Sequence, residues 1–163
     1  MFEVAILVLS DKGAKGDRED RTGAMLKESV KAFGWEVVYY EVLPDERDLL
    51  VERLISMCDY ARVDLVLTSG GTGLAPRDIT PEATLKVVDR QVPGLGEAMR
   101  AYGMQKTPRA MLSRGIAGIR KHTLIINLPG SIKGARESLE AVMGALEHGL
   151  DTLKGRATEC GQE

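Results

Sequence analysis

The chain has 163 residues, of which 44% are hydrophobic and 28% are charged, and its net charge at pH 7 is -2. This composition is ordinary for one globular domain with its own core, and the near-neutral charge gives no general attraction to nucleic acid or to an anionic membrane. Aromatic residues make up only 4% of the chain, which argues against a surface that stacks single-stranded bases.

The first nine residues are apolar, but no basic leader or cleavage site accompanies them, and no apolar run is long enough to span a bilayer. The two cysteines, Cys58 and Cys160, are isolated, which fits a reducing compartment better than a disulfide framework. Cys58 lies among apolar residues at helical spacing and is expected to be a buried thiol, whereas Cys160 falls in a polar stretch. We therefore expect a cytoplasmic protein with no membrane segment and no nucleic acid partner.

Predicted strands and helices alternate along the chain. Continuous apolar or β-branched runs predict strands at residues 4–9, 35–43, 63–68, 116–120 and 123–128, the last two forming a hairpin across Lys121 and His122. Helical spacing predicts helices at residues 26–33, 49–58, 95–104 and 132–153, and Thr80 as N-cap before Pro81 predicts the start of another. Residues 12–23 are expected to be a loop, residues 108–114 irregular, and residues 155–163 a polar tail. This alternation predicts an α/β fold, a single domain over residues 1–154, with a mostly parallel sheet covered on both faces.

Polar segments follow four of the predicted strands. They are Ser10-Asp11, Pro44-Asp45, the loop from Ser69 to Asp78, and residues 129–133. Ligands of open parallel sheets bind beyond the carboxyl ends of the strands, so strand alternation would bring several of these segments to one edge. This convergence indicates a binding site more strongly than any single motif does.

The turn Gly70-Gly71-Thr72-Gly73 lies between a strand and the start of a helix. Glycines let backbone N–H groups approach an anion, and the next helix adds the positive end of its dipole. Taken alone, such a turn is more often a tight connection between two elements. It has neither the Gly-Lys-Ser/Thr of a P-loop nor the glycine spacing of a dinucleotide fingerprint.

Asp45 and Asp78 are the candidate metal ligands. A bare phosphate would be repelled by Asp78, so this residue makes more sense as a ligand for a cation such as Mg²⁺ that accompanies phosphate. Two carboxylates at one sheet edge could hold Mg²⁺ against phosphate groups. The alternatives are that Asp45 caps the helix beginning near Asp48, and that Asp78 pairs with Arg77 on the surface.

Basic and hydroxyl side chains accompany these acids in the predicted loops. Arg77, Arg114 and Lys133 could stabilise charge on a transferring phosphoryl group, although a solvated surface charge is the default for each. Hydrogen bonds to a phosphate or a heterocycle could come from Ser10, Ser113 and Ser131. No Ser-His-Asp triad or histidine metal site is indicated, because neither His122 nor His148 has a motif around it. The cluster Glu19-Asp20-Arg21 is expected to be a solvated loop.

The segment from Ser69 to Thr84, Ser-Gly-Gly-Thr-Gly-Leu-Ala-Pro-Arg-Asp-Ile-Thr-Pro-Glu-Ala-Thr, closely resembles the core motif of molybdopterin-binding (Mog/MoaB-like) proteins. Further matches follow in one order over residues 2–154, at Ser10-Asp11, residues 43–46, Pro93-Gly94, and residues 110–114, 117–120 and 126–131. One departure is Ile132, where the family often has proline. It affects the expected shape of the loop before the last helix, and with it the expected role of Lys133.

The resemblance implies a three-layer α/β/α sandwich, commonly a homotrimer, that transfers the adenylyl group of Mg-ATP to molybdopterin and releases pyrophosphate. It implies that Asp45 and Asp78 are needed for activity and hold Mg²⁺. The glycine loop and the segment Asn127 to Ser131 match family segments that line the pterin and phosphate pocket. We accordingly expect the substrates molybdopterin and ATP at Ser10, Asp11, Gly70, Gly71, Thr72, Gly73, Arg77, Ser113, Arg114, Asn127, Pro129, Gly130, Ser131 and Lys133. A downstream metal-insertion protein is an expected partner.

Two other functions stay open at this point. A binding module of the same fold would hold the pterin without adenylylating it, and a general nucleotide-binding α/β protein would bind ATP without regard to molybdopterin. The presence of both Asp45 and Asp78 favours the enzyme, since a passive binder needs no Mg²⁺ site.

Overall fold

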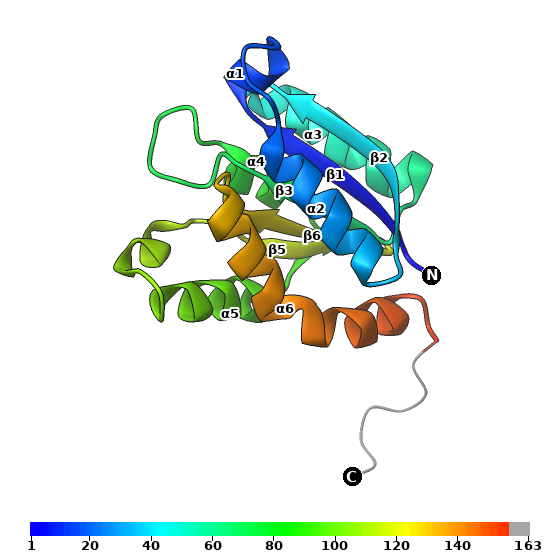
Figure 1. Cartoon of the computed structure of the whole chain (residues 1–163). Coiled ribbons are helices and arrows are strands. Elements are labelled where there is room, and N and C mark those ends of the chain that lie inside the picture. Colours follow the sequence, from blue (N-terminus) through cyan, green and yellow to red (C-terminus); the bar gives the residue numbers. More distant parts are fainter. Residues whose placement is uncertain (157–163) are drawn as a thin grey trace.

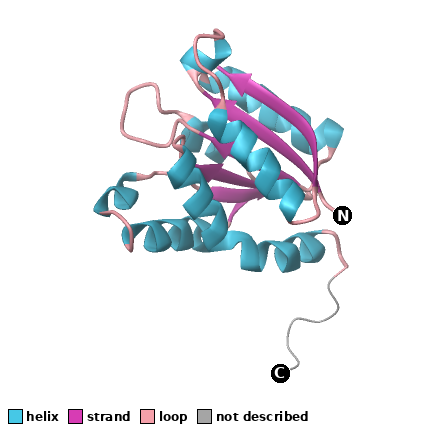
Figure 2. Ribbon diagram, in the orientation of Figure 1, coloured by secondary structure: helices cyan, strands magenta, loops and turns pink. Residues whose placement is uncertain are grey.

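The computed structural model describes residues 1–156, and within them a six-stranded sheet lies between two layers of helices (Figure 1, Figure 2). The strands are β1 (Glu3–Leu9), β2 (Glu36–Leu43), β3 (Leu65–Ser69), β4 (Arg90–Gln91), β5 (Ala117–Arg120) and β6 (Thr123–Leu128), in the order β2-β1-β3-β6-β5-β4. The strands β2, β1, β3 and β6 are parallel, and β5 is antiparallel to both of its neighbours. The predicted three-layer α/β/α sandwich with a mostly parallel, mixed sheet is confirmed.

Helices cover both faces of the sheet. They are α1 (Asp11–Ala14), α2 (Arg21–Ala32), α3 (Arg47–Ile55), α4 (Thr80–Val87), α5 (Pro93–Met104) and α6 (Ile132–Leu153), with a π-helical segment η1 (Ser56–Ala61) and a 3₁₀ helix η2 (Pro108–Leu112). On one face α2, α5 and α6 pack against the sheet, and on the other α3, η1 and α4 do. The long α6 spans that first face beside α5 and α2 (Figure 1).

The central strands are apolar on both faces because each face has its own helical layer. In β1, Ile6 belongs to the core under α2 and α6, while its neighbour Leu7 belongs to the core under α3 and α4. Both side chains are fully buried. A strand buried in this way gives a continuous apolar run rather than an alternating one, which is why β1, β3 and β6 were predictable.

Four predictions about local structure were wrong in detail. Residues 12–23 are not a continuous loop, because α1 begins at Asp11 and α2 begins at Arg21. The acidic cluster before α2 is not simply solvated, since the Asp20 carboxylate accepts hydrogen bonds from the Gly23 amide, at 2.9 Å, and from the Tyr40 hydroxyl. Thr80 is not an N-cap; Ile79 holds that position, and the Thr80 hydroxyl donates to the Gly70 carbonyl at 2.8 Å.

The fourth concerns β4, whose two residues pair with Ile119 and Gly118 and were missed because so short a strand leaves no periodicity. The predicted hairpin is confirmed. Strands β5 and β6 pair across Lys121 and His122, and Lys121 takes a positive φ of 53° in the turn.

No helix among residues 1–156 is long and apolar enough to cross a bilayer. Of the tail predicted from residue 155, residues 157–163, Cys160 included, lie outside the described residues.

Cys58 is buried in the core under α3, as predicted, and this burial raises the pKa of its thiol to about 11. Only the thiolate is a good nucleophile, so a folded protein at pH 8 should leave Cys58 protonated as well as shielded. In a Cys160→Ser background, we expect Cys58 to react with a disulfide reagent at least tenfold more slowly than the urea-unfolded chain does. Equal rates in the two states would contradict the burial of this thiol.

Candidate functional site

Polar segments from four strand ends meet at the carboxyl edge of the sheet, as the sequence predicted. They line a hollow of about 760 Å³, which we call the aspartate pocket. Its lining residues include Ser10, Asp11, Asp45, Ser69, Gly70, Gly71, Asp78, Gly130 and Ser131. Adjacent strand ends hold one another there: the Ser10 amide donates to Leu43, at 2.8 Å, and the Gly70 amide to Leu128, at 3.0 Å.

The glycine turn passes too close to its neighbours for side chains. Gly70 has φ +99°, and a Cβ there would overlap the backbone carbonyl oxygen of Leu9. Gly71 has φ +69°, and a Cβ would overlap the Thr80 hydroxyl and come within 3.4 Å of the Asp45 carboxylate. A Cβ on Gly73 would lie 2.8 Å from the carboxylate of Asp78. The missing side chains therefore leave room for both candidate metal ligands beside bare backbone.

Asp45 is held by a reciprocal pair of backbone contacts with Asp11. The Asp11 amide donates to the Asp45 carboxylate at 3.1 Å, and the Asp45 amide donates to the Asp11 carboxylate at 3.0 Å. Burial raises the pKa of Asp45, the Asp11 amide opposes this, and the charges of Asp11 and Asp78 add to the rise. The alternative that Asp45 caps α3 is wrong, because Glu46 occupies the N-cap and no side chain caps that helix.

Arg77 pairs with Asp11 and not with Asp78. Its Nε and Nη2 lie 2.7 and 2.9 Å from the two oxygens of the Asp11 carboxylate, a bidentate arrangement. The suggested surface pair of Arg77 with Asp78 is therefore wrong, and Arg77 ties the loop that carries Asp78 to the segment that positions Asp45.

The loop that carries Asp78 is held by a hydrogen bond to the Asp78 carboxylate and by hydrogen bonds from Arg114 to its backbone. The Asp78 carboxylate accepts from the Ala75 amide at 3.0 Å. The Arg114 guanidinium donates to the carbonyls of Gly73, at 2.8 Å, and Asp78, at 2.7 Å, and pairs with Glu82. Arg114 thus acts on the backbone of the loop that carries Asp78, not as a free charge in the pocket.

The donor set fits Mg²⁺ held jointly with a phosphorylated ligand. Among residues 1–156 no cluster of three or more His, Cys, Asp or Glu side chains forms a complete metal cage. Mg²⁺ does not need one, because it commonly binds one or two carboxylates and takes its other ligands from water and substrate phosphates. Asp45 and Asp78 could supply those carboxylates, and a bound cation would offset the charges of Asp11 and Asp78, which add to the rise that burial causes in the pKa of Asp45.

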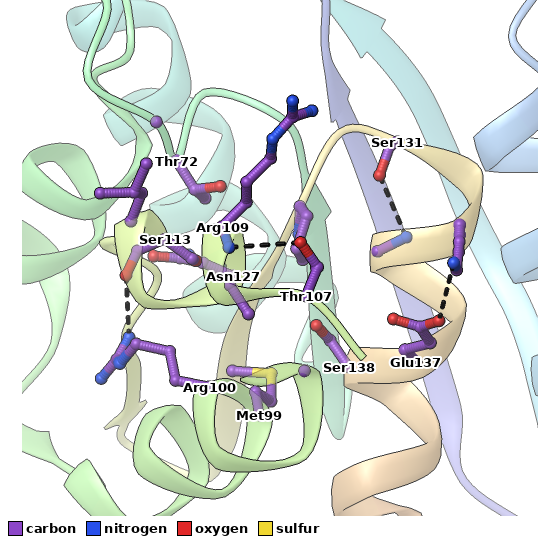
Figure 3. Close-up of a pocket in the computed structure, with 17 residues that line it drawn as sticks. Thr72, Met99, Arg100, Thr107, Arg109, Ser113, Asn127, Ser131, Glu137 and Ser138 are labelled. Atoms are coloured by element: carbon purple, nitrogen blue, oxygen red, sulfur yellow. Dashed lines mark hydrogen bonds and ion pairs between the residues drawn. The ribbon is translucent and has the colours of Figure 1, made fainter. Parts of the chain in front are cut away.

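A second hollow of about 350 Å³ adjoins the first, with Ser131 in the wall of both. We call it the α5–α6 cavity, since α5, η2 and the first turns of α6 enclose it (Figure 3). Six predicted substrate residues line it in addition to Ser131: Thr72, Gly73, Ser113, Asn127, Pro129 and Lys133. The glycine turn separates the two hollows, with Gly70 and Gly71 on one side and Thr72 and Gly73 on the other.

Several predicted substrate residues also make hydrogen bonds that hold the fold together. The Asn127 amide is buried and donates to Thr68, at 3.0 Å, and Thr84, at 2.9 Å, while its oxygen accepts from the Ile116 amide at 3.2 Å. Ser131 caps α6 through the Gly134 amide, as Ser10 caps α1 through Gly13. Pro129 and Gly130 shape the turn, their carbonyls accepting from the hydroxyls of Ser69 and Thr22. Lys133 is exposed and lies 3.9 Å from Glu137.

Sequence reasoning missed residues that line the α5–α6 cavity from outside the motifs. They are chiefly Met99, Arg100, Thr107, Arg109, Glu137 and Ser138 (Figure 3). Helical periodicity could place Met99 and Ser138 on buried faces, but it could not show that those faces meet around a cavity.

Three comparisons bear on this geometry. A family model described as a probable molybdopterin binding domain matches residues 5–148. The chain belongs to this family. Over 156 residues it is 47% identical to the molybdopterin adenylyltransferase of Helicobacter pylori, which covers 94% of this chain and 89% of that protein. It is 40% identical to the molybdopterin adenylyltransferase of Escherichia coli, covering 88% of this chain and 75% of the relative.

Solved structures agree with the family membership. The crystal structure of the molybdopterin biosynthesis enzyme MoaB from Thermus thermophilus superposes with a TM-score of 0.91 at 53% identity. That superposition covers 98% of this chain and all of the other. The resemblance identified from the sequence motifs is therefore confirmed.

The Asp11–Arg77 pair leads to a prediction about how the stability of the fold changes at acidic pH. The Arg77 guanidinium lowers the pKa of Asp11 from its usual 3.8 to about 2. Because the folded pKa is the lower one, the pair stabilises the fold at pH values above 3.8, and this contribution is lost as pH falls towards 2. In Arg77→Met we expect the pKa of Asp11, measured by carboxyl NMR titration, to return towards 3.8, while Arg77→Lys keeps part of the shift. An unchanged pKa in Arg77→Met would show that the pair is not formed in solution.

Proposed function

We propose that this protein is a molybdopterin adenylyltransferase, which transfers the adenylyl group of Mg-ATP to molybdopterin and releases pyrophosphate. The observation that carries the proposal is the pair Asp45 and Asp78 beside the bare glycine turn, with a second, smaller hollow directly adjoining. The relatives named molybdopterin adenylyltransferase support it.

Two substrates need two adjoining sites, and we assign one hollow to each. The aspartate pocket suits the triphosphate of ATP together with a metal, since Asp45 and Asp78 line it beside Gly71, which has no side chain to block its backbone. The smaller α5–α6 cavity, lined mainly by apolar atoms with a few hydroxyl, amide and charged groups, suits a heterocycle such as the pterin. Ser131, shared by both walls, then lies where the terminal phosphate of molybdopterin would face the α-phosphate of ATP.

The reaction requires no covalent intermediate on the protein. An oxygen of the molybdopterin phosphate attacks the α-phosphorus of ATP, the new P–O bond forms, and the bond to the bridging oxygen of the β-phosphate breaks. The electron pair leaves with pyrophosphate. Phosphoryl transfer of this kind depends on positioning and on charge stabilisation, which agrees with a site that holds two carboxylates in fixed positions beside a glycine turn.

When bound, Mg²⁺ would neutralise phosphate charge and orient the leaving group. Asp45 and Asp78 are the residues that would hold it. Asp11 and Arg77 fix Asp45 from one side, and Arg114 fixes the backbone of Asp78 from the other. The protein's own contribution is therefore a rigid spacing between two carboxylates that sit on different loops.

A single-turnover assay tests the proposal directly. The purified chain is mixed with molybdopterin, Mg²⁺ and ATP labelled in the α-phosphate, and adenylylated molybdopterin and pyrophosphate are measured. We expect stoichiometric transfer that stops when molybdopterin, ATP or Mg²⁺ is omitted. Tight binding of molybdopterin without pyrophosphate would instead identify a binding module, and ATP binding that ignores molybdopterin would identify a general nucleotide-binding protein.

Three finer proposals follow from the family resemblance. We propose that the protein acts in the cytoplasm, assembles as a homotrimer, and passes its product to a metal-insertion protein. Light scattering of the purified protein tests the trimer, and a mass other than three times 17.7 kDa would contradict it.

A further inference from the structure

Many polar side chains that line the α5–α6 cavity already make hydrogen bonds within the protein. Arg100 donates to the carbonyls of Ser113 and Gly115, Thr107 caps η2, Ser131 caps α6, and Asn127 satisfies three partners. These groups can shape the cavity, but few of their hydrogen-bonding positions are left for a ligand.

Glu137 and Ser138 differ from this set. Both belong to the first turns of α6 and line the cavity beside Met99 (Figure 3). The Glu137 side chain is only 14% exposed, and Ser138 is 7% exposed. Within residues 1–156 neither side chain makes a hydrogen bond, and the partner of Glu137 is Lys133, whose Nζ lies 3.9 Å away and whose side chain is 77% exposed.

A carboxylate in this position needs a better partner than Lys133. A long ion pair to a solvated lysine stabilises little, and the Glu137 carboxylate oxygens keep some solvent access, so they are open to a donor that enters the cavity. Glu137 is also the one acidic side chain among the described residues that line the cavity. An acceptor kept in a largely apolar hollow is best explained by a ligand that brings two donors.

The geometry points to Glu137 as the residue that recognises the 2-amino-4-oxopyrimidine edge of the pterin, with the Ser138 hydroxyl as a neighbouring contact; this inference rests on the proposed function. In a neutral pterin, N3–H and the 2-amino group are adjacent donors that match the two oxygens of one carboxylate. Replacing the 2-amino group by an oxygen, as in a lumazine, sets an acceptor against one carboxylate oxygen. Glu137 would therefore select pterins over 2,4-dioxo rings.

The experiment compares two fluorescent rings, 6-hydroxymethylpterin and 6-hydroxymethyllumazine, by titration at neutral pH. We expect wild-type protein to prefer the pterin by about tenfold or more, as for loss of one charge-assisted hydrogen bond with an unpaired acceptor left behind. In Glu137→Gln the amide can donate to the lumazine oxygen, so the preference should fall to within about twofold. Ser138→Ala should weaken binding of both rings while keeping the preference.

Glu147→Gln is the matched control, because it makes the same change at an exposed position of the same helix. It should keep the full preference for the pterin. An undiminished preference in Glu137→Gln, or the absence of any preference in wild type, would overturn the inference. The transfer assay separates this failure from a failure of the proposed function. If wild type adenylylates molybdopterin and Glu137→Gln keeps the preference for the pterin, only the role of Glu137 is refuted. If wild type shows no transfer, the proposed enzyme activity is refuted.

Discussion

Replacing Asp78 by asparagine is expected to lower the single-turnover rate of adenylyl transfer by on the order of 10²–10³-fold, the size of loss seen when one preorganised electrostatic contact is removed. Asparagine keeps the shape and can still accept the hydrogen bond from the Ala75 amide. It removes the negative charge that would hold Mg²⁺ against the phosphates. The fold should survive, because the loop is also braced by Arg114 through backbone carbonyls.

Asp45→Asn should have an effect of similar size, and the double variant should be little worse than either single one, since two ligands of one metal act as a unit. Mn²⁺ binding measured by electron paramagnetic resonance gives a readout that is independent of turnover. Asp48→Asn is the matched control, because Asp48 lies three residues from Asp45 with a side chain that is 91% exposed. Normal transfer in Asp78→Asn would remove Asp78 from the metal site.

The sheet edge was predictable because its elements are local and strongly patterned. Buried parallel strands leave continuous apolar runs, and a polar residue immediately after each run marks the carboxyl edge. Ser10, Asp45 and Gly70 were placed together on that basis, and the aspartate pocket brings them together. The short α1 and β4 escaped prediction, since four and two residues are too few for a period to be recognised.

The partners of charged side chains were harder to predict, because they depend on contacts between distant segments. Arg77 was weighed against its sequence neighbour Asp78, yet it binds Asp11, 66 residues away. The α5–α6 cavity likewise depends on how two helices and η2 pack, so Glu137 gave no signal beyond a charge on an amphipathic helix. Sequence motifs located the aspartate pocket and several residues that line the α5–α6 cavity, whereas the cavity itself and Glu137 required the structure.

The glycine turn itself supports the last prediction, which concerns stability. Gly70→Ala should lower the free energy of unfolding by about 3 kcal/mol, combining a left-handed backbone cost of about 1 kcal/mol with overpacking of about 2 kcal/mol. The overpacking arises because the new Cβ meets the Leu9 carbonyl, a backbone atom at the end of β1 that cannot rotate away. Urea unfolding followed by circular dichroism measures the change.

Substitutions at two other glycines separate the cost of the left-handed backbone from the cost of overpacking. Gly34 has a similar positive φ of 80°, but a Cβ added there would meet no atom within 4 Å, so Gly34→Ala should lose only the backbone part, about 1 kcal/mol. Gly144 lies inside α6 with the same open surroundings, so Gly144→Ala should be neutral or stabilise the fold by up to about 1 kcal/mol. If Gly70→Ala cost no more than Gly34→Ala, the turn would have room for a side chain. The close approach of β1 to the glycine turn would then not be what requires glycine at this position.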